Sequence, residues 1–436
     1  SATEYGTTQA RSVRLQAGAY VVDLAQPQGR LARTLLEPEA RLDSSFIARE
    51  LESRRTGQPD RFYDVTAWSL PYTYRVRAWW TRSTPGPLEP VSFGAAAATE
   101  PASARYGYAF EPGSEAGLRL LAGLLADSVR VWYAQRGFRV GENRFPHGAF
   151  LVRVAANDES VHERVRRHAA AAGAPVAALS SAMVDEGTDL GSNSVIPLRT
   201  PQVALLGGSP INGNSFGFAW FAFDQRLRYP VTPVSVSSLT GAALDDFNVL
   251  VVPSTSAGAL ERELGDAGRE RIAAWVRSGG TLITLDAATG WLASERLGLS
   301  RLRRDTTIAE GQDGAPLPAS VPGAIVRATA DTLSPLLAGV NQAELPVLVF
   351  SDRIYSAPRD LRPGEAVIRY AEQPRLRLAG YMWPEVPARL AGTPYLWTER
   401  VGRGRVIGFA GDPNFRDLWR GLLPLFANAV FFAGSY

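Results

Sequence analysis

Three aspartates stand where a fold could gather them into an acid–base site. Asp286 and Asp412 follow the apolar runs 281–285 and 405–411, and Asp224 lies near the end of a predicted helix. The carboxyl ends of parallel strands form the clefts of open α/β sheets, so side chains there can meet one ligand. Paired carboxylates in such a cleft can act as general acid and general base. The competing interpretation is that these aspartates form salt bridges with some of the many arginines.

A second group of residues could bind an anion. Ser254 and Ser256 stand just before a predicted helix, and Gly207 and Gly208 follow a predicted strand. Backbone N–H groups at a helix N-terminus attract phosphate. However, serines at this position are also ordinary turn and N-cap residues, and the glycines lack a complete G-x-G-x-x-G pattern. We therefore expect no cofactor on this chain.

The metal-binding residue types are scarce and badly spaced. The chain contains no cysteine and three histidines, His147, His162 and His168, none of which begins an H-x-x-E motif. Six residues correspond to a rotation of about 240° around a helix axis, so His162 and His168 cannot share one helix face. We therefore predict no metal site.

The composition is that of a globular protein with no specialised partner. The chain has 436 residues, of which 45% are hydrophobic and 20% charged, and a net charge of +3. Length alone predicts about two to four domains. All 46 basic residues are arginines, interleaved with acidic residues as in 49–55, which indicates solvated helix faces and no nucleic-acid partner. No apolar run reaches the roughly 18 residues of a membrane span.

The first half contains a weak internal repeat. Residues 18–36 and 148–169 both read as a turn glycine, an apolar strand, a polar turn and a helix. We therefore expect two related small α/β units, 1–100 and 105–200, joined by a linker over 83–104. The second copy follows a predicted helix that the first lacks, and the chain does not begin with Met. The first unit is thus expected to be truncated, with its missing part in a preceding, removed or absent segment.

From residue 201 the pattern changes to alternating strands and helices. Strands are predicted at 202–208, 231–236, 248–254, 281–286, 346–352 and 405–412, and helices at 216–227, 259–277 and 419–432. Continuous apolar strands between helices are typical of a parallel sheet covered on both faces. We expect a three-layer, flavodoxin-like domain over 201–436, with a looped insertion near 300–345.

Several segments resemble a known family. AGAYVV, LAQP, GRLA and LLEP in succession (17–38), FYDVTAWSLP (62–71) and DLGS (189–192) before a VALLGG strand are similar to the region downstream of the catalytic domain in bacterial zinc-carboxypeptidase-like proteins. The layout of 201–436 resembles a class I glutamine-amidotransferase-like domain. The resemblance implies a secreted or periplasmic metallopeptidase-like parent, with its zinc on a catalytic domain that this chain lacks. It also implies that the chain's partner is that N-terminal domain or another protein chain.

In amidotransferases a cysteine occupies the tight turn after a buried strand, and the resemblance places that turn at Asp286 and Ala287. Neither residue is a thiol or hydroxyl, and no cysteine or histidine occurs in 169–436. A Cys-His or Ser-His device is therefore impossible there. We expect a pseudoenzyme whose cleft is plugged by Trp291 and Phe415.

Three functions remain open. The first is a non-catalytic accessory or scaffold region, which predicts a large apolar face near residue 1. The second is a hydrolase with a carboxylate site, which requires convergent acids with shifted pKa values in a pocket. The third is a carbohydrate or envelope-polymer binder that uses exposed tryptophans, namely Trp79, Trp80, Trp383 and Trp397.

Overall fold

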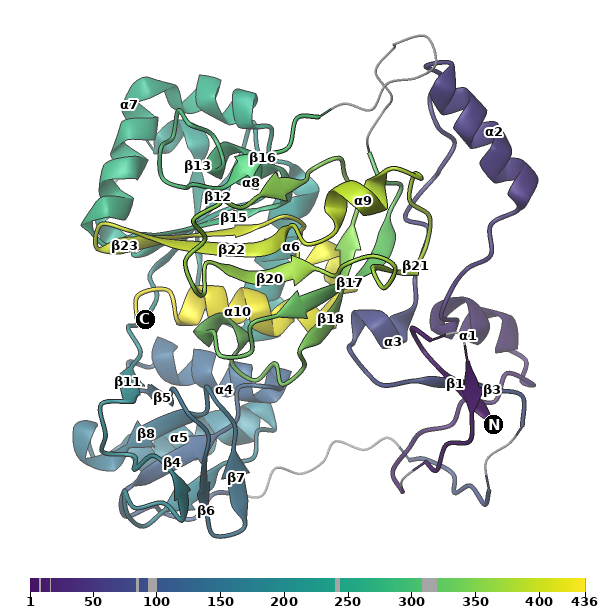
Figure 1. Ribbon diagram of the computed structural model, residues 1–436. Coiled ribbons are helices and arrows are strands. Elements are labelled where there is room, and N and C mark those ends of the chain that lie inside the picture. The colour runs from purple at the N-terminus through teal and green to yellow at the C-terminus, as the bar shows by residue number, and fades with distance from the viewer. Residues whose placement is uncertain are drawn as a thin grey trace.

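The computed structural model describes residues 1–436 except 8, 16, 84–85, 93–99, 240–243, 308–319 and 436. Its centre is a ten-stranded mixed sheet built by residues 203–409 (Figure 1). One half contains five parallel strands in the spatial order β13 (Thr232–Ser235), β12 (Val203–Gly207), β14 (Val249–Val252), β15 (Thr281–Leu285) and β23 (Gly404–Phe409). The other half is antiparallel and continues with β22 (Pro394–Val401), β20 (Ala366–Tyr370), β17 (Ala324–Ala330) and β18 (Glu344–Val349), while β21 (Arg377–Ala379) pairs with β17.

Helices cover both faces of the parallel half. In β14, Leu250 and Val252 belong to one core, with the apolar face of α7 (Ala257–Ser278), whereas Val249 and Val251 belong to the other. That second core includes α6 (Gly213–Phe221), the π-helical turn that continues it (Ala222–Leu227) and α10 (Leu423–Phe431). Successive strand residues point to opposite faces, so continuous apolar strands need both helix layers. The predicted three-layer parallel arrangement is confirmed for this half, and the antiparallel half was not predicted.

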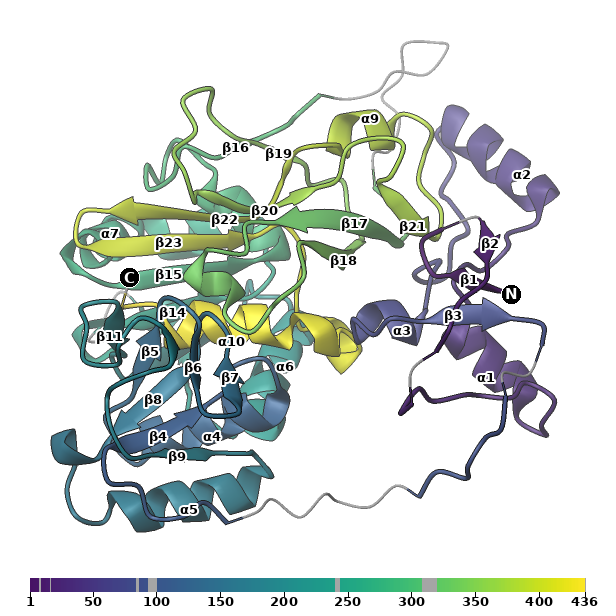
Figure 2. The ribbon, with the colours of Figure 1, turned by 60° about the horizontal axis from the view of Figure 1, so that its bottom comes forward.

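Residues 105–200 form a separate antiparallel sheet. Its order is β11 (Val195–Pro197), β5 (Trp132–Ala134), β8 (Phe150–Arg153), β4 (Gly107–Phe110) and β9 (Ala177–Leu179), with helices α4 (Glu115–Ala126) and α5 (Val161–Ala172). A hairpin of β6 (Phe138–Val140) and β7 (Asn143–Phe145) pairs with β10 (Glu186–Gly187). The Phe432 ring, just after α10, lies 4.7 Å from the Tyr133 ring and 5.8 Å from the Phe150 ring. Helix α10 therefore packs against both this unit and the large sheet (Figures 1 and 2).

The first hundred residues contain little sheet. They include α1 (Gly29–Leu36), α2 (Ser44–Arg55), the short α3 (Leu70–Thr73) and a small sheet of β2 (Ala10–Arg11), β1 (Ala2–Glu4) and β3 (Trp79–Thr81). The predicted strand at 18–22 is wrong, because that segment belongs to no strand or helix. In the second copy both the strand, β8, and the helix, α5, form as predicted. A strand needs a hydrogen-bonded neighbouring strand, and segment 18–22 pairs with none of the described strands.

Much of the aromatic-rich segment 62–72 packs against the large sheet, although Tyr63 is fully exposed. Thr66 Oγ1 donates to the Gly323 carbonyl at 2.7 Å and accepts from the Tyr381 backbone N–H at 2.7 Å. The Phe62 ring stacks on the Tyr381 ring at 5.5 Å. These contacts attach the first hundred residues to β17 and β21, on the right of Figure 1.

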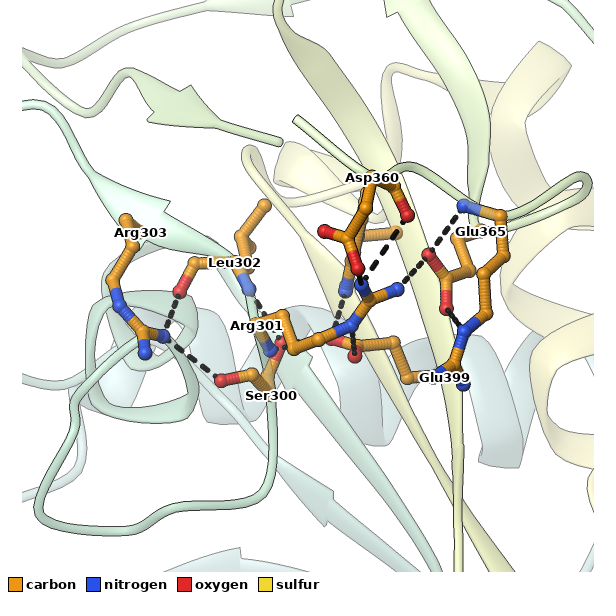
Figure 3. Close-up of polar contacts among 9 residues, drawn as sticks. Ser300, Arg301, Leu302, Arg303, Asp360, Glu365 and Glu399 are labelled. Atoms are coloured by element: carbon orange, nitrogen blue, oxygen red, sulfur yellow. Dashed lines mark hydrogen bonds and ion pairs between the residues drawn. The ribbon is translucent and has the colours of Figure 1, made fainter. Parts of the chain in front are cut away.

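A charged network fixes the loops beside the antiparallel half (Figure 3). The Arg301 guanidinium contacts the carboxylates of Glu365 and Glu399, the latter at 3.2 Å, and Asp360 at 2.9 Å. Glu399 also accepts from the Trp397 indole N–H at 2.6 Å. Glu365 and Glu399 are both buried, and Arg301 contacts both of them, while Arg362 Nε lies 4.0 Å from Glu365.

The remaining short elements lie around this sheet. They are α8 (Thr289–Leu292), α9 (Val386–Leu390) and a two-stranded ribbon of β16 (Arg303–Arg304) and β19 (Tyr355–Ser356). Within 300–345, where a looped insertion was expected, β17 forms a strand of the large sheet. In the described ranges, no helix is both long and apolar enough to cross a membrane.

Candidate functional site

A hollow of about 190 Å³ opens at the carboxyl edge of the parallel strands, where Asp286 and Asp412 meet. Asp286 directly follows β15, and Asp412 follows β23, the parallel neighbour of β15. The polar side chains that line the hollow come from six segments: Asn212, Asn214, Ser215, Ser254, Asp286, Ser351, Tyr370, Asp412 and Arg416. The structure thus brings together two of the three predicted aspartates.

Asp286 is held in place on both sides. Its backbone adopts φ of +51°, a left-handed conformation that is uncommon outside glycine. One carboxylate oxygen accepts from the Ser254 hydroxyl at 2.7 Å, and the other forms an ion pair with Arg353 Nη1 at 2.7 Å. Both oxygens of the Asp286 carboxylate are therefore already engaged, at the turn that follows β15.

Asp412 has a different environment. Burial and, to a smaller extent, the nearby charge of Asp286 raise the pKa of this carboxyl to about 6, against the hydrogen bonds from Ser215 and Asn414, which lower it. The Ser215 hydroxyl donates at 2.7 Å and the Asn414 backbone N–H at 2.9 Å. Near neutral pH this group can exchange a proton, whereas its neighbour is held by a cation.

Two serines connect the aspartates. Ser215 Oγ accepts from the Ser254 backbone N–H at 3.0 Å while its own proton goes to Asp412. Ser215 lies in the first turn of α6, which Asn212 caps by accepting from the backbone N–H groups of Asn214 and Ser215. The start of α6 therefore sets the distance between the loops that follow β14 and β23.

The prediction that Trp291 fills the cleft is wrong. This side chain is fully buried in the core beneath α7, where its indole N–H donates to Glu261 at 2.6 Å. Phe415 lines the hollow and contacts the rings of Phe218 and Phe350 at 5.7 and 6.0 Å. Phe415 is thus an apolar wall, and the hollow beside the aspartates stays open.

Other predicted residues lie elsewhere. Asp224 is exposed on the π-helical turn and accepts from the Gln225 amide. Ser256 is the N-cap of α7, its hydroxyl accepting from Ala259 N–H. Gly207 and Gly208 end β12 outside the hollow, and a Cβ on Gly207 would lie 2.9 Å from the Phe216 ring. Close packing explains Gly207 without an anion.

The histidines and tryptophans also take structural positions. His162 Nδ1 lies 2.6 Å from the Tyr108 hydroxyl, and His168 Nε2 lies 2.8 Å from Asp127. Among the described residues, no three His, Asp or Glu side chains gather as metal ligands do. Trp383 and Trp397 are fully buried and cannot form an exposed platform, while Trp79 and Trp80 are half-buried.

Ser215, Asn212 and Arg353 were missed in the sequence. The run NGNS (212–215) after a strand and turn has the spacing of an N-cap, so Asn212 and Ser215 could have been placed at a helix start. Arg353 carries no such signal, because its partner lies 67 residues away. Only the three-dimensional structure brings that pair together.

The large sheet, with helices on both faces of its parallel half, defines a mixed α/β protein. No protein-family model matches the chain, and no curated protein matches it. The fold is similar to that of a ThuA-like protein from Bacteroides uniformis, with a TM-score of 0.35 and 16% identity, over 52% of this chain and 89% of that one. It is also similar to that of a glutamine amidotransferase from Thermotoga maritima, with a TM-score of 0.33 and 9% identity, over 53% of this chain and 96% of that one.

A third similar structure is a beta-galactosidase from Bacillus circulans, with a TM-score of 0.32 and 12% identity over 72% of this chain and 47% of that one. At such identities the similarity extends to the fold alone. These comparisons give the carboxypeptidase resemblance no support.

Proposed function

We propose that this chain is a non-catalytic accessory module that packs against another protein domain through its first hundred residues. The observation that carries this proposal is where the exposed apolar side chains lie. Most of the large hydrophobic residues that remain exposed precede residue 92: Tyr20, Val21, Val22, Leu31, Leu42, Leu51, Tyr63, Tyr74, Val76, Leu88 and Val91. Concentrated apolar exposure of this kind marks an interaction surface.

The segment 18–22 indicates what the partner supplies. Its counterpart, β8, is the middle strand of the five-stranded sheet, with β5 on one side and β4 on the other. Segment 18–22 has the same apolar pattern but pairs with none of the described strands, and Tyr20 is 73% exposed. The occupant we propose is therefore a domain that adds β-strands to this segment, with main-chain hydrogen bonds for affinity and apolar contacts for burial.

The finer proposal takes the partner to be a zinc-carboxypeptidase-like catalytic domain, outside the cytoplasm. It rests on the sequence resemblance of segments 17–38 and 62–71. In this arrangement zinc belongs to the partner, and the present chain positions or restricts the partner's active site.

The state of the Asp286 turn favours a non-catalytic role for the large domain. A nucleophile there would need a free, activated side chain, yet Asp286 is tied to Arg353 and Ser254. Neither cysteine nor histidine occurs in 169–436.

The experiment combines the chain with a zinc-carboxypeptidase-like domain supplied in trans. Hydrogen exchange of backbone amides in 18–22 should be fast in the chain alone and slow in the mixture. Val22→Asp should weaken the association at least tenfold, since it places a charge in an apolar contact. Leu333→Asp is the matched control, because Leu333 is 82% exposed and lies far along the chain.

Two outcomes would contradict the proposal. The first is unchanged exchange in 18–22 in the presence of the domain. The second is slow exchange in the chain alone together with sedimentation as a dimer, which would make a second copy of the chain the occupant.

A second candidate function is hydrolysis at the carboxylate pair. The favouring observation is that Asp412, with a pKa of about 6, stands near an ion-paired Asp286 in an open hollow. Two carboxyl groups with different protonation states are the arrangement that acid–base catalysis requires. Amide, ester and glycoside substrates should then be turned over by the parent chain and not by Asp412→Asn or Asp286→Asn. Absence of turnover by the parent chain excludes this candidate.

A further inference from the structure

A second hollow, of about 470 Å³, lies at the opposite edge of the large sheet. Its wall contains four arginines: Arg199, Arg400, Arg403 and Arg405. Arg405 stands at the amino end of β23, level with Thr281 at the start of β15, whereas Asp286 and Asp412 follow the carboxyl ends of these strands. This arginine hollow is therefore separate from the aspartate site.

The arginine hollow has an unbalanced charge. Arg400 and Arg405 are directly opposite each other on β22 and β23, and like charges in that position repel. None of the described residues that line the hollow is acidic. Among the described residues, no carboxylate lies within 4.0 Å of the guanidinium groups of Arg199, Arg400 or Arg403.

Elsewhere on the chain, arginines that gather around a hollow are paired. A hollow of about 370 Å³ is lined by Arg327, Arg375 and Arg377. The first two share Glu344, and Arg377 pairs with Glu39. Salt bridges thus balance the arginines of that hollow, whereas none of the described carboxylates pairs with Arg199, Arg400 or Arg403.

Helix dipoles offset only part of the charge. Helix α7 ends at Ser278, and the segment after α10 contributes Ala433 and Gly434, so two helix C-termini lie near the arginines. Each C-terminus corresponds to about half a negative charge. Counting only Arg199, Arg400 and Arg403, this leaves roughly two positive charges unbalanced.

We propose that the arginine hollow binds a small oxyanion that carries at least two negative charges, such as a diphosphate. The guanidinium group donates in a planar fork that matches phosphate and carboxylate oxygens. Arg405 is buried at the base of the hollow, and the other three arginines are exposed at its rim. A divalent anion would therefore be approached from several sides, with the hydroxyls of Ser278 and Ser435 as further donors.

The test is calorimetric titration of the full chain with inorganic pyrophosphate at constant ionic strength, so that screening does not change. The variant Arg400→Gln/Arg403→Gln removes two exposed charges and should fold normally. We expect one pyrophosphate per parent chain and at least tenfold weaker binding by the double variant. Arg375→Gln, in the paired hollow, should bind within twofold of the parent. Citrate tests whether carboxylates replace phosphates.

Saturable pyrophosphate binding that the double variant loses supports the proposal, and equal binding of citrate extends it to polycarboxylates. A parallel measurement of Tm should show that pyrophosphate raises the Tm of the parent chain more than that of the double variant. The proposal is overturned if the parent binds no pyrophosphate at millimolar concentration, or if Arg375→Gln weakens binding as much as the double variant.

Discussion

Replacing Asp412 with asparagine should make the protein more stable at neutral pH. Burial raises the pKa of Asp412 from 3.8 to about 6, so the folded state holds this proton more tightly than the unfolded state does. Stability is therefore lost as the pH rises from about 4 to about 6, and the loss is complete above pH 6. A shift of about two units corresponds to about 3 kcal/mol. Because Asp412 keeps some exposure to the hollow, we expect about 1–3 kcal/mol.

Asparagine is neutral at every pH and can still accept from the Asn414 N–H. The free energy of unfolding, measured by urea denaturation from pH 4 to pH 8, should thus be equal for parent and variant at pH 4 and higher for the variant above pH 6. Asp224→Asn, at an exposed aspartate, should show no such pH dependence. The reasoning is refuted if Asp412→Asn is less stable than the parent by the same amount at every pH. In that case the hydrogen bonds from Ser215 and Asn414 would outweigh the burial of charge.

Two further substitutions test the packing that positions the sites. Arg301→Ala removes the cation that buried Glu365 and Glu399 share and leaves Glu365 only the more distant Arg362, so we expect a loss of about 2–3 kcal/mol in urea denaturation. Arg296→Ala, at an exposed pair, should lose less than about 1 kcal/mol. Gly404→Ala would place a Cβ 2.0 Å from the Val276 carbonyl oxygen and should lower the Tm strongly, because backbone cannot give way. Gly217→Ala, in α6 with no atom within 4 Å of the new Cβ, should instead raise stability by up to about 1 kcal/mol.

The parallel half of the sheet could be predicted because its strands are continuous apolar runs in the sequence. A run such as that of β14 is apolar at every position, which only a sheet covered on both faces accepts. The antiparallel half lacks an equivalent signal. Strand β17 pairs with β18, β20 and β21, and these partners are separated from it by loops of irregular length. The apolar pattern of such a segment indicates that it is buried, but it does not indicate with which strands it pairs.

Segment 18–22 also shows that an apolar pattern does not determine strand pairing. Its apolar pattern matches β8, yet it forms no strand, because sheet hydrogen bonds come from a neighbour and not from the segment itself. The apolar residues of 18–22 therefore predict a paired strand, and the described part of the chain supplies none.

The aspartate site could be predicted in outline for a simple geometric reason. Strands β15 and β23 are parallel, so the residues that follow them lie at one edge. The hydrogen-bond partners could not be predicted in the same way, since Ser215 and Asp412 are 197 residues apart. Whether a carboxylate is tied up or free to titrate depends on those partners, and therefore the chemistry of the site is a property of the folded chain.

The length of β23 separates the arginine hollow from the aspartate site. Six residues of extended strand, Gly404–Phe409, span about 20 Å. Charges separated by more than the Debye length of about 8–10 Å are largely screened at physiological salt. An anion at Arg400 and Arg403 therefore has little direct electrostatic effect on the proton of Asp412. Any coupling between the hollows would have to pass through movement of β23 itself, and that strand is buried along its length and bonded to β15 and β22 on either side. A rigid strand of this kind separates the two sites, so loss of pyrophosphate binding and a changed pH dependence of stability report on different edges of the same sheet.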